Sequence, residues 1–181
     1  MTPFHVLVAD PPWSFDDALP GRGRGAAKHY PTLPPHEIMR FPLPPLAADA
    51  ILLLWRVASQ PALALDVVSA WGFVPKSEII WVKTAKARAT QPLRLAIGMG
   101  HYTRASHEAC ILATRGKPKV RDHGVRSVFF APRRRHSEKP PEVHALAERL
   151  CAGPYAELFA RARREGWTQY GRDLPGGKAH P

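Results

Sequence analysis

The stretch Phe4–Ala9 is short and apolar, which is typical of a buried strand in an α/β sheet. Asp10, Pro11, Pro12 and Trp13 follow it at once. Two consecutive prolines lack backbone donors and fix φ, so the strand must end and the chain must turn after Asp10. Ligands of open parallel sheets bind beyond the carboxyl ends of the strands. The sequence therefore predicts an acidic side chain at a ligand site.

The residue types of this turn suit a flat heterocycle that carries an exocyclic amine, such as adenine. Asp10 and the carbonyls of Pro11 and Pro12 can accept hydrogen bonds from the amine, while Trp13 can stack on the ring. A purely structural role is the alternative, because Asp-Pro is a common turn opener and a tryptophan after a turn often packs in the core.

A chain of 181 residues is long enough for one domain with helices on both faces of a sheet. Its 20 prolines are roughly twice the usual share and indicate stiff connections. Cys110 and Cys151 lie far apart without metal-ligand spacing, so we expect both to be buried in a reducing compartment. His101, His107 and His136 also lack such spacing, and no metal is expected.

The first strand begins close to Met1, which leaves no room for a signal peptide. No apolar run reaches the roughly 18 residues of a membrane span. We therefore expect a cytoplasmic protein that does not contact membranes.

Apolar runs alternate with segments of helical spacing, which predicts an α/β fold without internal repeats. The expected strands after the first are 50–55, 78–82, 109–114, 155–159 and 167–170. A helical turn is expected at 36–40, with helices at 63–71 and 140–151. Segments 21–27 and 83–103 are expected to be loops, and the tail from Leu174 to be disordered.

The chain carries 26 Lys and Arg against 15 Asp and Glu, a net charge of +11, which favours a polyanionic partner. Between Arg115 and Arg135 the sequence holds eight bases and a single acid, Asp122. Nucleic-acid phosphate is the natural ligand for such a stretch, and a solvated basic loop is the alternative. Segments 21–27, 83–103 and 115–135 are the candidate loops for contact with a nucleic-acid strand.

Several motifs recur in an order that resembles one known family. They are Asp10-Pro11-Pro12-Trp13, His29-Tyr30-Pro31-Thr32-Leu33, Leu54-Trp55, Trp71-Gly72-Phe73, 78–84, His107-Glu108 through Gly116, 136–140, and 157–161 through Gly166-Trp167. Together they resemble the MT-A70-like family of adenine N(6)-methyltransferases, from about residue 5 to residue 173, as a compact bacterial or phage-type member.

The resemblance implies a single Rossmann-like, S-adenosylmethionine-dependent methyltransferase domain over residues 1–173, followed by a disordered tail at 174–181. It also implies a circularly permuted order, in which the half that carries Asp10 precedes the cofactor half. The sequence has no Gly-x-Gly-x-x-Gly motif. The strand end Leu158-Phe159-Ala160-Arg161 stands in its place in the family pattern.

The implied reaction is methyl transfer from S-adenosyl-L-methionine to the exocyclic amine of adenine in nucleic acid. Positioning of the amine by Asp10 and the Pro11 carbonyl, rather than strong base catalysis, is expected to supply most of the rate. The implied catalytic residues are Asp10, Pro11, Pro12 and Trp13. The implied substrate-binding residues are Tyr30, Glu108, Lys83, Arg133, Arg134 and Arg135. The implied cofactor-binding residues are Asp10, Lys139, Glu157, Phe159, Arg161, Arg172 and Asp173.

This sequence departs from the family pattern at two pairs. Arg163-Arg164 stands where some relatives have His-Asn, and Arg172-Asp173 stands where they have Asn-Gln. At these two pairs, the contacts that relatives make with the ribose and adenine of the cofactor do not carry over residue by residue.

A compact, Arg- and Pro-rich chain favours DNA over RNA as the substrate, with the protein acting as a monomer or homodimer. An RNA N(6)-adenosine methyltransferase is the first alternative. A catalytically inactive relative that only binds nucleic acid is the second. A small-molecule methyltransferase would leave the basic stretch unexplained.

Overall fold

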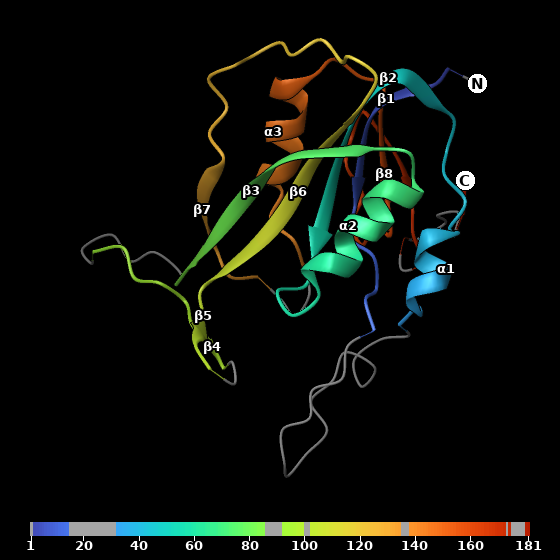
Figure 1. Ribbon diagram of the computed structural model, residues 1–181. Helices are drawn as coiled ribbons and strands as arrows, with labels where there is room; N and C mark the ends of the chain where they lie inside the picture. The colour runs from blue at the N-terminus through green and yellow to red at the C-terminus, as the bar shows by residue number, and fades with distance from the viewer. Residues whose placement is uncertain are drawn as a thin grey trace.

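The computed structural model describes residues 2–14, 32–85, 92–99, 102–134, 138–172, 174 and 180–181. Its centre is a seven-stranded sheet with the order β7-β3-β6-β2-β1-β8-β9 (Figure 1). The strands are β1 (Phe4–Ala9), β2 (Leu46–Arg56), β3 (Val74–Thr84), β6 (His107–Arg115), β7 (Val128–Pro132), β8 (Tyr155–Leu158) and β9 (Trp167–Tyr170). Three helices accompany them: α1 (Pro35–Met39), α2 (Pro61–Ala70) and α3 (Glu142–Leu150). The expected α/β architecture is confirmed.

Within this sheet only β6 runs antiparallel to its neighbours. The carboxyl ends of the six parallel strands therefore meet at one edge, which we call the carboxyl edge. β1 lies between β2 and β8, so its end at Ala9 falls in the middle of that edge. This is the place where an open parallel sheet binds ligands.

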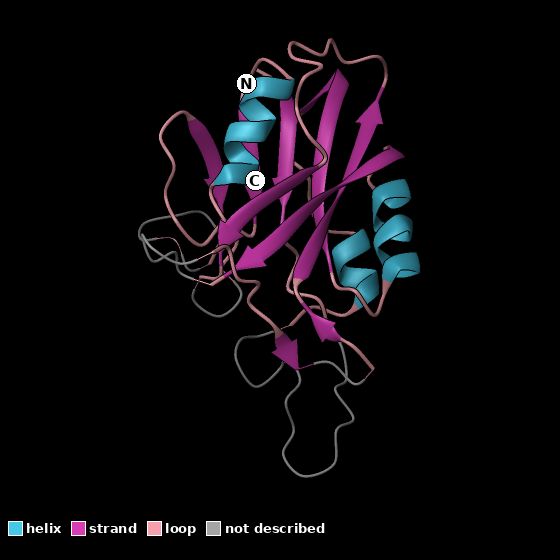
Figure 2. Cartoon of the chain, turned by 90° about the vertical axis from the view of Figure 1, so that its left-hand side faces the viewer, coloured by secondary structure: helices cyan, strands magenta, loops and turns pink. Residues whose placement is uncertain are grey.

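The core is formed on both faces of the sheet by alternating side chains. Leu7 and Ala9 of β1 point to one face, and Val6 and Val8 point to the other. Helices α1 and α2 cover the first face and α3 covers the second (Figures 1 and 2). Each fully buried Val or Leu contributes about 1.5–3 kcal/mol relative to an exposed one. Cys110 and Cys151 are buried and free, as expected.

The structure corrects the expected loop at 115–135, because β7 runs through it. β6 is the reversed strand, so Arg115 at its end lies at the edge of the sheet opposite to Asp10. β7 then carries the chain back to the carboxyl edge, where Arg133 follows it. Among the described basic residues of this stretch, Arg115 and Arg133 thus lie at opposite edges of the sheet.

Two further strands were missed by sequence interpretation. β4 (Gly98–Met99) lies within the expected loop 83–103 and β5 (Arg104–Ala105) lies directly after it, and the two pair as a separate antiparallel sheet. Such short pairs give no periodic signal. β3 also begins four residues earlier than expected. Its first residues, Val74 to Ser77, are exposed and lack apolar alternation, so the sequence did not predict them as strand.

The predicted loop 21–27 lies outside the described residues. At the other end of the chain, Leu174 is buried and the ring of His180 lies 5.2 Å from that of Phe41. In the described part of the chain, no helix combines the length and apolar character needed to cross a bilayer. The permuted order stays a prediction, and the position of the Asp10 strand ahead of β8 and β9 is consistent with it.

Candidate active site

Hydrogen bonds fix the turn after β1. The Trp13 amide donates to the Pro11 carbonyl at 2.8 Å, and the Leu33 amide donates to the Pro12 carbonyl at 2.9 Å. Each carbonyl oxygen has a second lone pair, so both can still accept from a ligand. Pro11 is buried, whereas Pro12 lines a cavity beside Asp10.

The indole of Trp13 anchors this turn to the core. It is 3% exposed, and its Nε1 donates to the Trp55 carbonyl at 3.0 Å. A base could stack on this ring only after the turn moved. The stacking role of Trp13 therefore stays a prediction, while its structural role is visible. Trp55, Trp71 and Trp81 are core residues, as the sequence indicated.

Four side chains form a line of alternating charge along the carboxyl edge, which we call the charged cluster. Lys139 Nζ lies 2.9 Å from the Asp10 carboxylate and 3.3 Å from Glu108 Oε2. Lys83 Nζ lies 2.6 Å from Glu108 Oε1. The cluster joins the end of β1, the start of β6, the end of β3 and the segment before α3. Its members were predicted for three separate roles, and the fold brings them into one network.

Burial and pairing shift the pKa values of this cluster. Burial raises the pKa of Asp10, and the ammonium of Lys139 only partly opposes this effect. Burial would lower the pKa of Lys139, but the carboxylates of Asp10 and Glu108 outweigh it and the pKa is raised. Burial would raise the pKa of Glu108, but Lys139 and Lys83 lower it below its ordinary value of 4.5. Lys139 thus stays charged and serves both carboxylates.

Glu108→Gln is expected to lower the free energy of unfolding by about 2 kcal/mol near neutral pH, because charge-assisted bonds to two ammonium groups are lost. The native pKa of Glu108 lies below 4.5, so its contribution is complete above that value and is lost as the pH falls through the native pKa. Urea unfolding at several acidic pH values should show that the difference in free energy of unfolding between Glu108→Gln and wild type shrinks as the pH falls. Asp66→Asn on the exposed face of α2 is the control. A difference that stays constant with pH would contradict the assignment.

Two cavities meet at Asp10. The larger has a volume of about 550 Å³ and lies beside α1, with Leu33, Phe41 and Arg172 in its wall. The smaller, of about 170 Å³, is lined by Lys139, His144 and Glu157 among others. Asp10, Phe159 and Arg161 line both cavities. The predicted cofactor residues, apart from Asp173, therefore surround one continuous region at the ends of β1 and β8.

The loop between β8 and β9 closes this region, and its backbone is constrained at both ends. Phe159 has a φ of 61°, a left-handed conformation that costs a bulky residue about 1–3 kcal/mol and persists only where packing fixes it. Its ring lies 4.5 Å from that of Phe41. Gly171 at the end of β9 packs so closely on Ala160 that a Cβ would overlap the Ala160 carbonyl.

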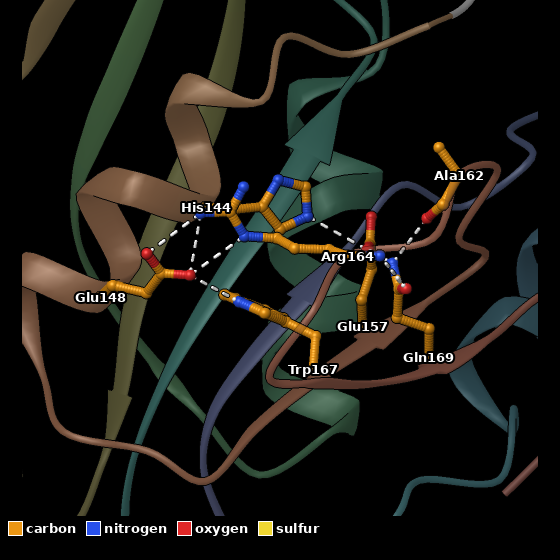
Figure 3. Close-up of polar contacts among 7 residues, drawn as sticks. All are labelled: His144, Glu148, Glu157, Ala162, Arg164, Trp167 and Gln169. Carbon is orange, nitrogen blue, oxygen red and sulfur yellow. Dashed lines mark hydrogen bonds and ion pairs between the residues drawn. The ribbon is translucent and has the colours of Figure 1, made fainter.

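Three polar residues that sequence interpretation missed hold this loop and the two strands that flank it (Figure 3). Glu148 of α3 accepts from the Arg164 guanidinium at 3.0 Å and from Trp167 Nε1 at 2.7 Å. His144 Nε2 lies 3.0 Å from Glu157 Oε2. Gln169 contacts Glu157 and the loop backbone. An isolated polar residue in a helix or strand carries no local signal, so only the tertiary structure reveals this network.

Two of the three predicted arginines are among the described residues. Arg133 and Arg134 follow β7 and line an open cavity of about 500 Å³, and Arg134 Nε donates to Glu138 Oε1 at 2.7 Å. Arg134 also lines the smaller cavity beside Asp10. Tyr30, Arg135 and Asp173 fall outside the described residues. Within the described residues, no group of three His, Cys, Asp or Glu side chains is arranged to hold a metal.

Comparison with known proteins supports the sequence motifs. A model of the MT-A70 family matches residues 4–173. The chain is 33% identical over 178 residues to an N(6)-adenosine-methyltransferase MT-A70-like protein of Arabidopsis thaliana and 32% identical over 177 residues to the N(6)-adenosine-methyltransferase catalytic subunit METTL3 of Homo sapiens. These matches cover 96% of the chain but only 24% and 28% of the two relatives, so it spans about a quarter of their length.

A second kind of relative is matched along most of its own length. The chain is 28% identical over 196 residues to the type II methyltransferase M.MunI of a Mycoplasma species. That match covers 97% of the chain and 79% of the relative.

Proposed function

The chain belongs to the MT-A70 family, and from this premise we propose that it transfers a methyl group from S-adenosyl-L-methionine to the exocyclic amine of adenine in nucleic acid, with DNA as the favoured substrate. The observation that carries the proposal is the place of Asp10 at the end of β1, which lies between β2 and β8. The predicted cofactor residues Glu157, Phe159 and Arg161 lie on the β8 side of Asp10. The predicted substrate residues Lys83 and Glu108 lie on the β6 and β3 side.

The region around the two cavities fits S-adenosylmethionine in size and chemistry. Its larger cavity, of about 550 Å³, falls within the ~300–1,000 Å³ typical of small-molecule sites. Phe41 and Phe159 offer aromatic surface for a flat ring, and Arg161 and Arg172 stand near it. The Lys139 ammonium suits the carboxylate of the cofactor. When bound, the cofactor supplies an electrophilic methyl group on a sulfonium.

The residues of the chain would position the amine rather than activate it strongly. An aromatic amine is a weak nucleophile because its lone pair is delocalised into the ring. The carboxylate of Asp10 and the second lone pair of a prolyl carbonyl can accept both amine protons, which turns the nitrogen lone pair towards the methyl group. Lys139 holds Asp10 at 2.9 Å and so fixes the acceptor. The amine becomes acidic once methylated, so proton loss can follow the transfer.

The similarity along 79% of the type II methyltransferase supports a compact enzyme of that kind, and with it DNA. The N(6)-adenosine-methyltransferases are matched over a quarter of their length, which keeps RNA as the alternative substrate. A base in a duplex must be flipped out or presented unpaired before it can reach Asp10.

Radiolabelled methyl transfer to matched single-stranded and duplex DNA and RNA oligonucleotides tests the proposal. We expect labelled N(6)-methyladenine, with more product from DNA. Product from RNA alone would favour the alternative substrate. Binding of S-adenosylmethionine without any transfer, or no binding at all, would favour an inactive nucleic-acid-binding relative.

Arg133→Gln is expected to weaken nucleic-acid affinity by a similar factor for all sequences, because a phosphate contact carries no sequence information. The slope of log K against log salt should fall by about 1. Fluorescence anisotropy with a labelled oligonucleotide at several salt concentrations measures both. Lys76→Gln, at the exposed start of β3 on the far edge of the sheet, removes the same charge and should leave the slope unchanged. Equal slopes for Arg133→Gln and wild type would refute the contact.

A further inference from the structure

Gln169 of β9 is a buried polar side chain with an unusual set of partners. It is 8% exposed, and its amide makes three hydrogen bonds. Nε2 donates to Glu157 Oε2 at 2.6 Å and to the Ala162 carbonyl at 2.7 Å. Oε1 accepts from the Arg164 amide at 2.7 Å. Both donor hydrogens and one acceptor position are thus used, which fixes the amide in one orientation.

The three partners of Gln169 lie at the smaller cavity, although Gln169 itself does not. Gln169 is absent from the described walls of both cavities, whereas Glu157, Ala162 and Arg164 all line the smaller one. One buried amide therefore joins the end of β8 to two points of the loop that follows it (Figure 3). The loop is tied to α3 as well, because the Arg164 guanidinium bonds to Glu148.

We propose that Gln169 is a positioning residue for the cofactor, because it sets the distance between the Glu157 carboxylate and the loop 159–166 and so the shape of the smaller cavity. The inference rests on the proposed function of this region as the S-adenosylmethionine site. A hydrophobic residue of similar size would fill the space but leave the Glu157 carboxylate, the Ala162 carbonyl and the Arg164 amide without this partner.

Gln169→Leu tests the proposal. We expect the Kd and KM for S-adenosylmethionine to rise about tenfold while kcat changes less than about twofold, since a cavity wall contacts the cofactor in the ground state and the transition state alike. Calorimetry gives the Kd without turnover. Thr168→Ala, on the exposed face of the same strand, is the matched control and should bind as wild type does.

Hydrogen–deuterium exchange reports on the loop independently of the cofactor. In Gln169→Leu the Arg164 amide loses its acceptor, and its exchange should become at least about tenfold faster. Exchange in the core strand β2 should stay unchanged, which would show that the variant is folded.

Gln169→Glu separates a positioning role from simple packing. The introduced carboxylate faces Glu157, and the two can share a proton only as the pH is lowered, which restores a donor between them. The Kd of this variant relative to wild type should therefore improve towards acidic pH, whereas that of Gln169→Leu should keep a constant ratio. Wild-type affinity in Gln169→Leu would overturn the inference alone. No binding of S-adenosylmethionine to the wild type would overturn the proposed function, and the inference with it.

Discussion

Asp10→Ala is expected to abolish methyl transfer and leave nucleic-acid affinity largely intact. Without the carboxylate, the amine loses the acceptor that orients its lone pair, and loss of one preorganised group of this kind costs about 10²–10³ in kcat. Asp10→Asn has a side chain of the same size with one acceptor oxygen, and it should keep more of the activity than Asp10→Ala does. Single-turnover transfer with a radiolabelled methyl group measures the chemical step directly.

The fold should survive this change, because Lys139 keeps Glu108 as a partner at 3.3 Å. Burial disfavours the charged form of Asp10 and raises its pKa, so wild-type activity should fall as the pH is lowered through that pKa. Asp66→Asn serves as the control for an unrelated carboxylate on an exposed helix face. Turnover by Asp10→Ala near the wild-type rate would refute the assigned role.

Lys139→Met is expected to have the largest effect on stability. It removes the ammonium that contacts both Asp10 and Glu108. Breaking a buried ion pair on one side typically costs about 3–5 kcal/mol, and the lower end of that range is expected because these side chains are part-buried. Binding of S-adenosylmethionine should also be lost or greatly weakened. Urea unfolding and calorimetry measure the two effects separately.

The pH dependence of this variant gives a second check. Its two carboxylates would lose the ammonium between them, with Lys83 still beside Glu108 and Arg161 still acting on Asp10, so their pKa values rise and protonation relieves the repulsion. The stability deficit relative to wild type should therefore shrink as the pH is lowered. Lys119→Met, which changes an exposed lysine, should leave stability within about 0.5 kcal/mol of wild type. A small, pH-independent loss in Lys139→Met would contradict the shared-partner role.

The sequence predicts the middle of the site well because its signals are local. A buried apolar run followed by Asp10 and two prolines places Asp10 at a strand end, and the structure puts that end between β2 and β8 at the carboxyl edge. Trp13 shows the limit of such reasoning, since its residue type suits either stacking or the core. Only the hydrogen bond to Trp55 and the burial of the indole reveal the anchor.

Features that depend on distant pairing could not be predicted. The contact of Lys83 with Glu108 follows from the register of β3 on β6, where Trp81 pairs with Glu108. β7 was hidden because its strand is half exposed, with Phe130 on the surface and arginines close behind. Gln169 gave no signal because its importance comes entirely from what it touches.

The residues that meet at the site lie far apart in the sequence, so the site can form only late in synthesis. Asp10 and Lys139 are 129 positions apart, and β1 gains its second neighbour only when β8 joins the sheet. Contacts this distant form late, after the entropy of closing a long loop has been overcome. A nascent or truncated chain that carries the Asp10 turn but ends before β8 therefore lacks two of the seven strands, together with Phe159, Arg161 and Arg172 of the cavity wall. We therefore expect incomplete polypeptides to lack activity until the last strands have joined the sheet. A chain divided ahead of β8 would regain its pocket only when the two pieces reassemble.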